Sequence, residues 1–141
     1  MCGLNAIFAY GAGAPNVEPG ELIAVRDAMT ERGPDAEGSW ISADGRVGLG
    51  HRRLSIIDLS QAANQPMALA GGRVRVAYNG EIYNFRALRR RLQAEGRVFE
   101  TESDTEVLLH LYDRDGPEMV RHLRGMFAFA LWDEERRGML L

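Results

Sequence analysis

The sequence predicts an α+β domain, because short apolar runs of strand length alternate with segments in which apolar residues recur at helical spacing. Glycine and proline separate these segments. With 141 residues, of which 45% are hydrophobic, the chain can build one domain with a core and is too short for two of ordinary size. We therefore expect a single domain.

The first half of the chain is expected to form a strand, a loop, a helix and a hairpin. In that order the segments are residues 2–9, 10–20, 21–31, and 38–41 with 47–49. Leu22, Val25 and Met29 would give the helix one apolar face, and Gly33 with Pro34 would end it.

The second half is expected to alternate strands and helices. The segments are a strand at 74–78, a helix from about 84, a helix opening at 103, a short helix at 117–123, and strands at 126–132 and 139–141. Ser103 and Glu106 match a capping box. Asn79-Gly80 after a strand fits a type I′ hairpin turn when only the local sequence is considered. Because residues 139–141 begin a strand without completing a fold, we expect the chain to be a fragment.

Composition excludes several classes of function. A net charge of −3 gives no basic excess for binding nucleic acid. The longest apolar run, Met126 to Trp132, is seven residues, against the roughly 20 that a membrane span needs, and no signal peptide precedes it. One cysteine allows neither an internal disulfide nor a cysteine metal cluster, so we expect a cytoplasmic protein without a metal site. All 17 basic residues are arginine, which excludes a Schiff-base lysine and a Walker A loop.

Cys2 is the first candidate for chemistry. A lone cysteine is often a small buried apolar residue. At position 2, however, removal of Met1 would place a free α-amine on the same residue as the thiol. The reference pKa of such an amine is about 7.7–8.0, so near neutral pH part of it can accept the thiol proton. Cys2 could then supply both nucleophile and base.

Seven segments occur in a familiar order along nearly the whole chain. They are MCGLNAIF (1–8), RGPDAEGSW (32–40), LGHRRLSIIDLS (49–60), NQPM (64–67), YNGEIYNF (78–85), ESDTEVLLHLY (102–112) and LRGMFAFALWD (123–133). Together they resemble the glutaminase half of the glutamine-hydrolysing asparagine synthetase family. That half is a class II glutamine amidotransferase, one of the N-terminal-nucleophile hydrolases.

The resemblance implies a fold and an arrangement of domains. The fold is a four-layer αββα sandwich of two antiparallel sheets, with its C-terminal strands truncated here. Residues 1–141 would form the N-terminal glutaminase domain, incomplete at its C-terminus, and the synthetase domain would be absent. The expected partners are L-glutamine and that synthetase domain, and a homodimer is compatible with the family. No cofactor is expected in this chain, because ATP and magnesium would bind only in the missing domain.

The resemblance also implies the catalytic residues. Cys2 would attack the side-chain amide of glutamine and form a glutamyl thioester, from which water releases glutamate. The Asn79 side-chain amide and the Gly80 backbone N–H would form the oxyanion hole, replacing the hairpin-turn interpretation. Two such donors must lie about 2.7–3.1 Å from the developing oxyanion. A glycine suits this role because the backbone must approach the substrate closely.

Further residues are implied to recognise both charged ends of glutamine. Arg53 would clamp the α-carboxylate, and Glu81 with Asp104 would face the α-ammonium. Ile56 and Ile57 fall where the family lines the substrate with backbone groups. Each position also has an ordinary interpretation: a surface or salt-bridged arginine, a first-turn acid favourable to the helix dipole, and apolar strand residues.

The remaining polar candidates are interpreted as structural. His51 is expected to make a structural hydrogen bond, His110 and His122 to lie on amphipathic helices, and Asp35 to stabilise a turn. Two positions depart from the family pattern: Glu31 replaces a usual histidine, and Ala6 replaces a common glycine. We expect both departures to affect packing near the site more than the chemistry.

Three functions remain open on the sequence. The first is the glutaminase half of an asparagine-synthetase-like ligase, whose ammonia would pass to an ATP-activated carboxylate in the missing domain. The second is a catalytically silent fragment that acts as a binding or docking module. The third is an amidotransferase for an acceptor other than aspartate, such as a sugar, a peptide or an antibiotic precursor.

Overall fold

The computed structural model describes residues 2–141 and contains two antiparallel sheets. The strands of the first, in spatial order, are β1 (Gly3–Phe8), β3 (Val47–Arg53) and β2 (Ala36–Ile41). The strands of the second are β4 (Met67–Ala68), β5 (Val74–Ile82), β6 (Gly125–Asp133) and β7 (Gly138–Leu140).

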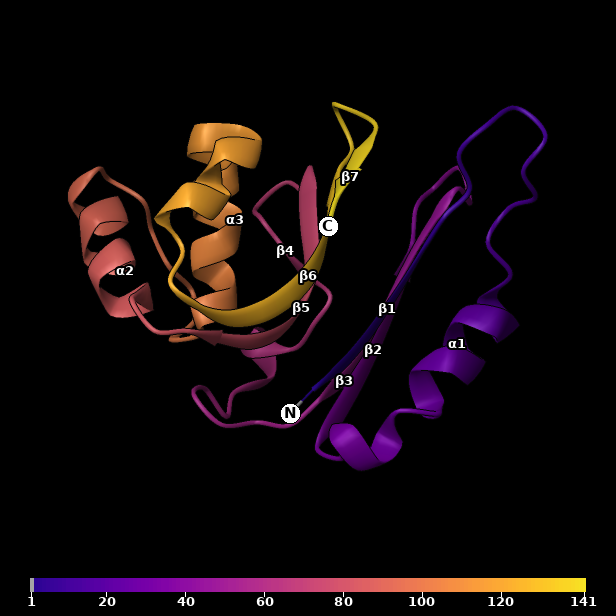
Figure 1. The fold of residues 1–141 in the computed structure, drawn as a ribbon. Helices are drawn as coiled ribbons and strands as arrows, with labels where there is room; N and C mark the ends of the chain where they lie inside the picture. The colour runs from indigo at the N-terminus through magenta and orange to yellow at the C-terminus, as the bar shows by residue number, and fades with distance from the viewer. Residues whose placement is uncertain (1) are drawn as a thin grey trace.

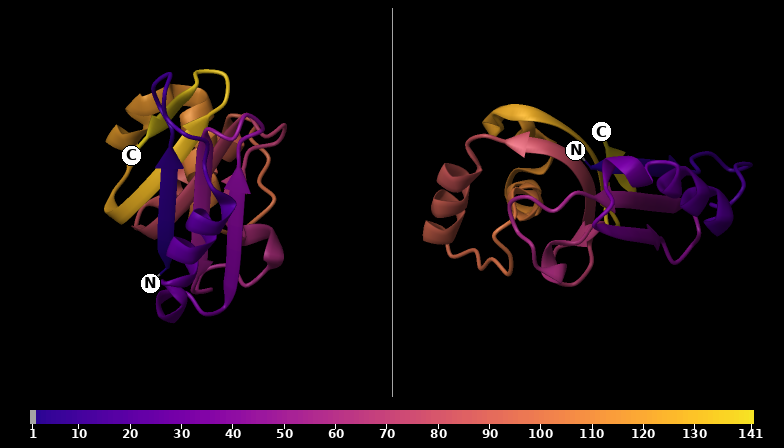
Figure 2. Two further views of the ribbon diagram at one scale, coloured as in Figure 1. Left: turned by 90° about the vertical axis from the view of Figure 1, so that its right-hand side faces the viewer. Right: turned by 90° about the horizontal axis from the view of Figure 1, so that it is seen from below.

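Helices cover the outer face of each sheet. The α-helices are α1 (Pro19–Asp27), α2 (Phe85–Ala94) and α3 (Asp104–Asp115), and the 3₁₀ helices are η1 (Thr30–Arg32), η2 (Gln61–Ala63) and η3 (Gly116–His122). Figure 1 shows α1 outside the first sheet and α2 and α3 outside the second, with the sheets facing each other; Figure 2 shows the same order of layers from two other sides. The predicted α+β class and αββα layering are therefore confirmed.

The two sheets meet through a core in which alanines lie beside larger apolar side chains. Val47 and Leu49 of β3 pack against Ala77 of β5 and against Ala130 and Trp132 of β6. Side chains alternate along a strand, so the residues of β3 between them face α1 instead. These include glycines, and a Cβ on Gly48 would lie 2.9 Å from Val17 Cγ1. Small residues thus bring sheet and helix, and sheet and sheet, into close contact.

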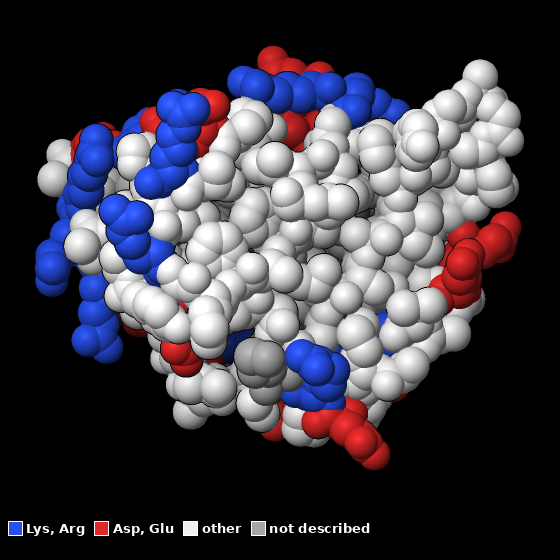
Figure 3. Space-filling model, viewed as in Figure 1, with Lys and Arg blue, Asp and Glu red and all other residues white. Residues whose placement is uncertain are grey.

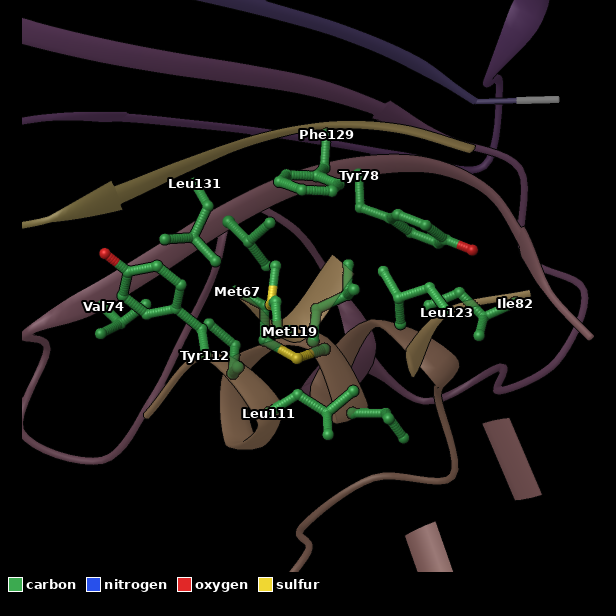
Figure 4. Close-up of a cluster of buried hydrophobic side chains, with 14 of the residues drawn as sticks. Met67, Val74, Tyr78, Ile82, Leu111, Tyr112, Met119, Leu123, Phe129 and Leu131 are labelled. Carbon is green, nitrogen blue, oxygen red and sulfur yellow. The ribbon is translucent and has the colours of Figure 1, made fainter. Parts of the chain in front are cut away.

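A second and larger core lies between the second sheet and its helices. Helix α3 supplies its centre, and α2 packs against α3. Figure 4 shows the cluster, in which Leu111 and Tyr112 of α3 lie beneath Val74 and Leu131 of the sheet. Tyr78 of β5 lies at its edge with the hydroxyl pointing away from the cluster. Helix α3 is therefore held firmly against β5, and its first turn is positioned by this packing.

Strand β5 is paired unequally along its two edges. Strand β6 pairs with it from Val74 to Ile82, whereas β4 pairs only with Arg75 and Val76. From Tyr78 onward the β4 edge of β5 therefore lacks a neighbouring strand. Asn79 and Gly80 lie inside this strand, opposite Ala128 and Phe127. The hairpin-turn interpretation of Asn79-Gly80 is wrong, because the pairing with β6 continues through both residues.

Helix α1 differs from its predicted boundaries and face. It ends at Asp27, four residues earlier than expected, and η1 follows it. Its buried residues are Leu22 and Arg26, whereas Val25 is exposed. Arg26 is accommodated there because its guanidinium pairs with Asp27 while its Cβ packs close to Gly50. The apolar-face pattern could not anticipate an arginine held against glycine.

The predicted capping box at Ser103 is half formed. The Ser103 side chain caps α3 by accepting from the Thr105 N–H at 3.1 Å. Glu106 does not return to the cap, however, and accepts instead from the backbone N–H groups of Glu100 and Thr101. The carboxylate thereby fixes the segment that leads into α3 and so fixes where that helix begins.

The face seen in Figure 3 is largely uncharged at its centre, with arginines along its upper and left borders. None of the helices described among residues 2–141 is long and apolar enough to cross a membrane.

The helix-side core predicts a large effect of truncating one of its leucines. Leu111→Ala should lower the free energy of unfolding by about 2–5 kcal/mol, because Leu111 is completely buried and the cavity cannot fully collapse. Leu141→Ala, at a residue that is 82% exposed, is the matched control and should change it by less than about 0.5 kcal/mol. Urea unfolding followed by circular dichroism measures both, and equal effects would contradict the assigned core.

Candidate active site

A cavity of about 270 Å³ lies where the thiol, the open edge of β5 and the start of α3 meet. It is lined by Cys2, Arg53, Leu54, Ile56, Ile57, Asp58, Ala63, Gln65, Tyr78, Asn79, Gly80, Glu81, Ser103, Asp104, Thr105 and Met126. All eight residues singled out from the sequence are among them. The folded chain therefore brings together residues that are more than a hundred positions apart in sequence.

Cys2 lies immediately before β1 and on the face of that strand that looks toward the second sheet. Its Sγ accepts a hydrogen bond from the Leu54 N–H at 3.3 Å and lies 3.7 Å from the Leu54 carbonyl oxygen. These contacts hold the sulfur against the first residue of the loop that follows β3. The predicted removal of Met1 concerns a residue outside those described.

The open edge of β5 directs a backbone donor into the cavity. Alternate residues of an antiparallel strand point their N–H and C=O groups to the same side. On the β4 side, Val74 bonds Leu69 through its carbonyl oxygen and Ile82 donates its N–H to Asp104. Gly80 belongs to the same set, and no strand lies beside it. Its N–H is therefore directed toward the cavity.

Gly80 occupies a position that no other residue fits. Its φ is +151°, and a Cβ there would lie 2.2 Å from the Met126 carbonyl oxygen and 2.5 Å from the Phe127 Cα. The neighbouring Asn79 has its side chain on the opposite face, toward the first sheet, where Cys2 also lies. A side-chain amide and a backbone N–H from consecutive residues thus reach one cavity.

Asp104 is buried and fixed by two hydrogen bonds. Its Oδ2 accepts from the Tyr78 hydroxyl at 2.7 Å and from the Ile82 N–H at 3.2 Å. It is also the first residue of α3, where the helix dipole favours a negative charge. Burial nevertheless raises the pKa of Asp104, because removing a carboxylate from water disfavours its ionised form. Burial, and then the same carboxylate, raise the pKa of Tyr78, which remains a hydrogen-bond donor.

Arg53 closes β3 and organises the loop that follows it. Its guanidinium donates to the Ser60 carbonyl oxygen at 2.8 Å, to Asn64 Oδ1 at 2.7 Å and to the Asp58 carbonyl oxygen. All three acceptors are neutral oxygens, so none of these bonds is made to a carboxylate. The predicted surface arginine is instead only 7% exposed and faces the cavity.

The loop held by Arg53 forms one wall of the cavity. Ile56 and Ile57 belong to this loop and are partly exposed, so their interpretation as strand residues is wrong. The loop is bound to the start of α3 as well, because Asp58 Oδ2 accepts from the Glu102 N–H at 2.8 Å. Glu81 lines the cavity at its exposed side. Ile56 and Ile57 line the cavity, and contact of their backbone groups with the substrate stays a prediction.

Three lining residues escaped the reasoning from sequence. Gln65, Tyr78 and Leu54 each make a hydrogen bond that positions another site residue. Gln65 and Tyr78 do lie in the segments NQPM and YNGEIYNF, so their location in a shared motif was the available signal. Leu54 contributes only backbone groups, which no pattern of side chains reveals.

Other polar candidates lie outside the cavity, as expected. Asp35 Oδ2 accepts from the Ser55 N–H at 2.7 Å, which agrees with a structural turn. Arg52 pairs with Glu37 on the opposite face of β3. His110 is buried on α3, and His122 lies in η3 beside Asp115. Within residues 2–141, no group of three or more histidine, cysteine, aspartate or glutamate side chains could hold a metal ion.

Comparisons with known proteins agree on one kind of domain. A family model described as a glutamine amidotransferase domain matches residues 1–141. The chain is 46% identical over 96% of its length to asparagine synthetase [glutamine-hydrolyzing] 3 of Bacillus subtilis, and 40% identical over 99% to amidase chry2 of Gibberella zeae. It spans only 22% of each of these relatives.

A solved structure shares the fold. The structure of glutamine phosphoribosylpyrophosphate amidotransferase from B. subtilis, in complex with ADP and GMP, superposes with a TM-score of 0.55 and 30% sequence identity. The match covers 64% of this chain and 22% of that one. The two facing sheets are therefore those of an N-terminal-nucleophile hydrolase.

The contacts of Gly80 predict that it cannot be replaced. Gly80→Ala should lower the free energy of unfolding by about 1–3 kcal/mol, since β5 and β6 must separate to admit the Cβ. Gly13→Ala, where a Cβ would meet nothing within 4 Å, is the matched control. Thermal unfolding of both variants measures the difference, and a Gly80→Ala protein as stable as the control would refute this account of the strand.

Proposed function

We propose that this chain, which belongs to the glutamine amidotransferase domain family, hydrolyses glutamine to glutamate and ammonia with Cys2 as its nucleophile. One observation carries the proposal. The Cys2 thiol, the Gly80 N–H and two buried groups of opposite charge, Arg53 and Asp104, line a single cavity. This cavity thus combines a nucleophile, an oxyanion donor and one group for each charge of an amino acid.

The first step is formation of a thioester. Once Met1 has been removed, the α-amine of Cys2 accepts the thiol proton and the sulfur attacks the side-chain carbonyl carbon of glutamine. The Leu54 N–H holds the sulfur in position before attack. The C–N bond breaks as the same amine returns its proton to the leaving ammonia, and water then releases glutamate. This chemistry needs no metal ion or cofactor in the chain.

The oxyanion of the tetrahedral intermediate requires two donors. Asn79 Nδ2 and the Gly80 N–H come from consecutive residues of β5, a strand fixed by its pairing with β6. Donors held in advance by a strand need no rearrangement as the charge develops, which is the main source of their catalytic effect. Loss of one such donor typically slows the reaction by about 10²–10³-fold.

The zwitterion of glutamine matches the charges of the cavity. Arg53 would bind the α-carboxylate, and Asp104 with Glu81 would bind the α-ammonium. Arg53 and Asp104 are both buried, so a ligand that lacks either charge leaves one of them uncompensated in a poorly solvated site. Selection against uncharged amides follows from this arrangement.

In the whole protein, ammonia would pass to an activated acceptor. Relatives named glutamine-hydrolysing asparagine synthetases are several times longer than this chain, so a synthetase domain that binds ATP and magnesium is proposed to follow it. Aspartate is the acceptor suggested by those names. The relative named amidase chry2 is 40% identical over 99% of this chain, which supports an acceptor other than aspartate as the alternative proposal. A cytoplasmic location fits both proposals.

Covalent labelling tests the proposed nucleophile. The purified chain should form one adduct with the glutamine analogue diazo-oxo-norleucine, located on a Cys2 from which Met1 is absent, and should release glutamate from glutamine. A variant with an uncleaved extension before Cys2 is the control and should do neither, because its α-nitrogen is an amide that cannot accept a proton. Intact mass and peptide mapping measure the adduct. An unlabelled Cys2 with a free amine would refute the proposal.

Asp104 predicts a specific pH dependence. Its pKa is raised by burial, so the carboxylate that binds the ammonium is lost on acidification at a higher pH than for an ordinary aspartate. The value of kcat/KM should therefore fall as pH decreases through that raised pKa, chiefly because KM rises. Asp104→Asn should lower kcat/KM and remove this limb of the profile. Asp115→Asn, on the same helix outside the cavity, should keep it, and a profile unchanged by Asp104→Asn would contradict the assignment.

A further inference from the structure

Tyr78 is held by side chains where a neighbouring strand would normally bond its backbone. Its N–H donates to Gln65 Oε1 at 2.6 Å, and its carbonyl oxygen accepts from His51 Nε2 at 2.9 Å. All three residues are buried. Both backbone groups of one residue are thus satisfied by two side chains from different parts of the chain.

These two bonds replace the strand that β5 lacks at this point. Strand β4 pairs with β5 only as far as Val76, and Tyr78 is the next residue that points its backbone groups to that side. Gly80 is the next after it. Without His51 and Gln65, the β5 edge would have two unpaired buried groups beside the oxyanion donor, a costly arrangement that would favour movement of the strand.

His51 also connects the two sheets. It lies on β3 two residues before Arg53 and on the same face of the strand, while Tyr78 belongs to β5 of the second sheet. The bond therefore ties the sheet that carries Cys2 and Arg53 to the strand that carries the oxyanion donors. Such a tie fixes the distance between nucleophile and oxyanion hole, which come from different sheets.

The protonation state of His51 suits this task. Burial and the nearby Arg53 lower the pKa of His51 to about 4, so the imidazole is neutral at physiological pH. A carbonyl oxygen can only accept, so the single proton must lie on Nε2. Nδ1 is then an unprotonated nitrogen, and it has no hydrogen-bond partner among the described residues. His51 is thus an uncharged donor and is not placed to act as a base.

We propose that His51 and Gln65 are positioning residues, which hold the Tyr78 peptide and thereby set the oxyanion hole of β5 against Cys2 on the facing sheet. The proposal rests on the proposed function, because it assigns these bonds to the same site. It differs from a purely structural role in one respect. The oxyanion forms only during the reaction, so misplaced donors lower kcat by a larger factor than they raise KM.

The decisive comparison is between variants that keep or remove each hydrogen bond. His51→Gln retains a donor near the position of Nε2, whereas His51→Leu removes it; Gln65→Glu retains an acceptor, whereas Gln65→Leu removes it. The two leucine variants should lower kcat by about 10- to 100-fold, with KM changed less than about threefold. His51→Gln should recover most of the loss. The alkylation rate of Cys2 by iodoacetamide, which needs no oxyanion hole, should stay within about threefold of the unmodified chain.

Two measurements do not depend on activity. Nitrogen-15 spectra at pH 7 should show His51 protonated at Nε2 only, and hydrogen exchange at Tyr78 and Asn79 should accelerate at least about tenfold in the leucine variants but not in His51→Gln. A chain that neither labels nor hydrolyses glutamine refutes the proposed function, while these measurements still decide whether the bonds hold the strand.

Several results would overturn the positioning role. They are a leucine variant with unchanged kcat, a His51→Gln protein as slow as His51→Leu despite a folded circular-dichroism spectrum, a rise of KM alone, or unchanged exchange in β5. If His51→Leu does not fold, the Gln65 pair makes the same comparison, since Gln65 bonds the other backbone group of Tyr78.

Discussion

The site depends on the unequal pairing of β5. Strand β6 bonds one edge along its whole length, and β4 leaves the other edge after Val76. An unpaired edge normally invites association with another chain or exposes polar groups. Here its groups are bonded individually: Tyr78 by two side chains and Ile82 by Asp104. The N–H of Gly80 lies between these bonded groups and is available to a ligand. Because β6 holds the other edge of β5, the direction of this donor is fixed.

Close approach of the two sheets makes this donor useful. The core between them contains alanines where larger residues would separate the layers, and Cys2 and Asn79 lie on the two inner faces. A reaction that needs a nucleophile from one sheet and an oxyanion donor from the other tolerates little change in their spacing. The larger core of α3 and β5 contributes differently, because it fixes the helix end that bears Asp104.

Much of the fold could be predicted from periodicity, and most of the site only from the resemblance. Strands and helices were found where apolar spacing is regular, as in α2 with buried Leu88 and Leu92. Local rules failed at Asn79 and Gly80, because pairing with the distant β6 overrides a turn-forming dipeptide. They failed at Arg26 as well, since a buried arginine needs glycine beneath it and carboxylates beside it.

The positioning residues His51 and Gln65 show why the rest of the site could not be predicted from the sequence. The bonds that hold Tyr78 come from His51 and Gln65, and both form only when three separate segments of the chain meet. Polar residues of this kind carry no periodic signal in a sequence. The expected structural hydrogen bond of His51 is confirmed, yet its acceptor could be identified only from coordinates.

The buried charges of the cavity have a consequence for the stability of the whole domain. Without ligand, Arg53 faces neutral oxygens, and Asp104 bonds uncharged donors at a helix N-terminus. Each charge is therefore largely buried without an opposite charge bonded to it, which costs folding free energy. A zwitterion that neutralises both charges would return that free energy. Glutamine binding would therefore stabilise the folded domain, and the melting temperature of the domain would rise with the glutamine concentration.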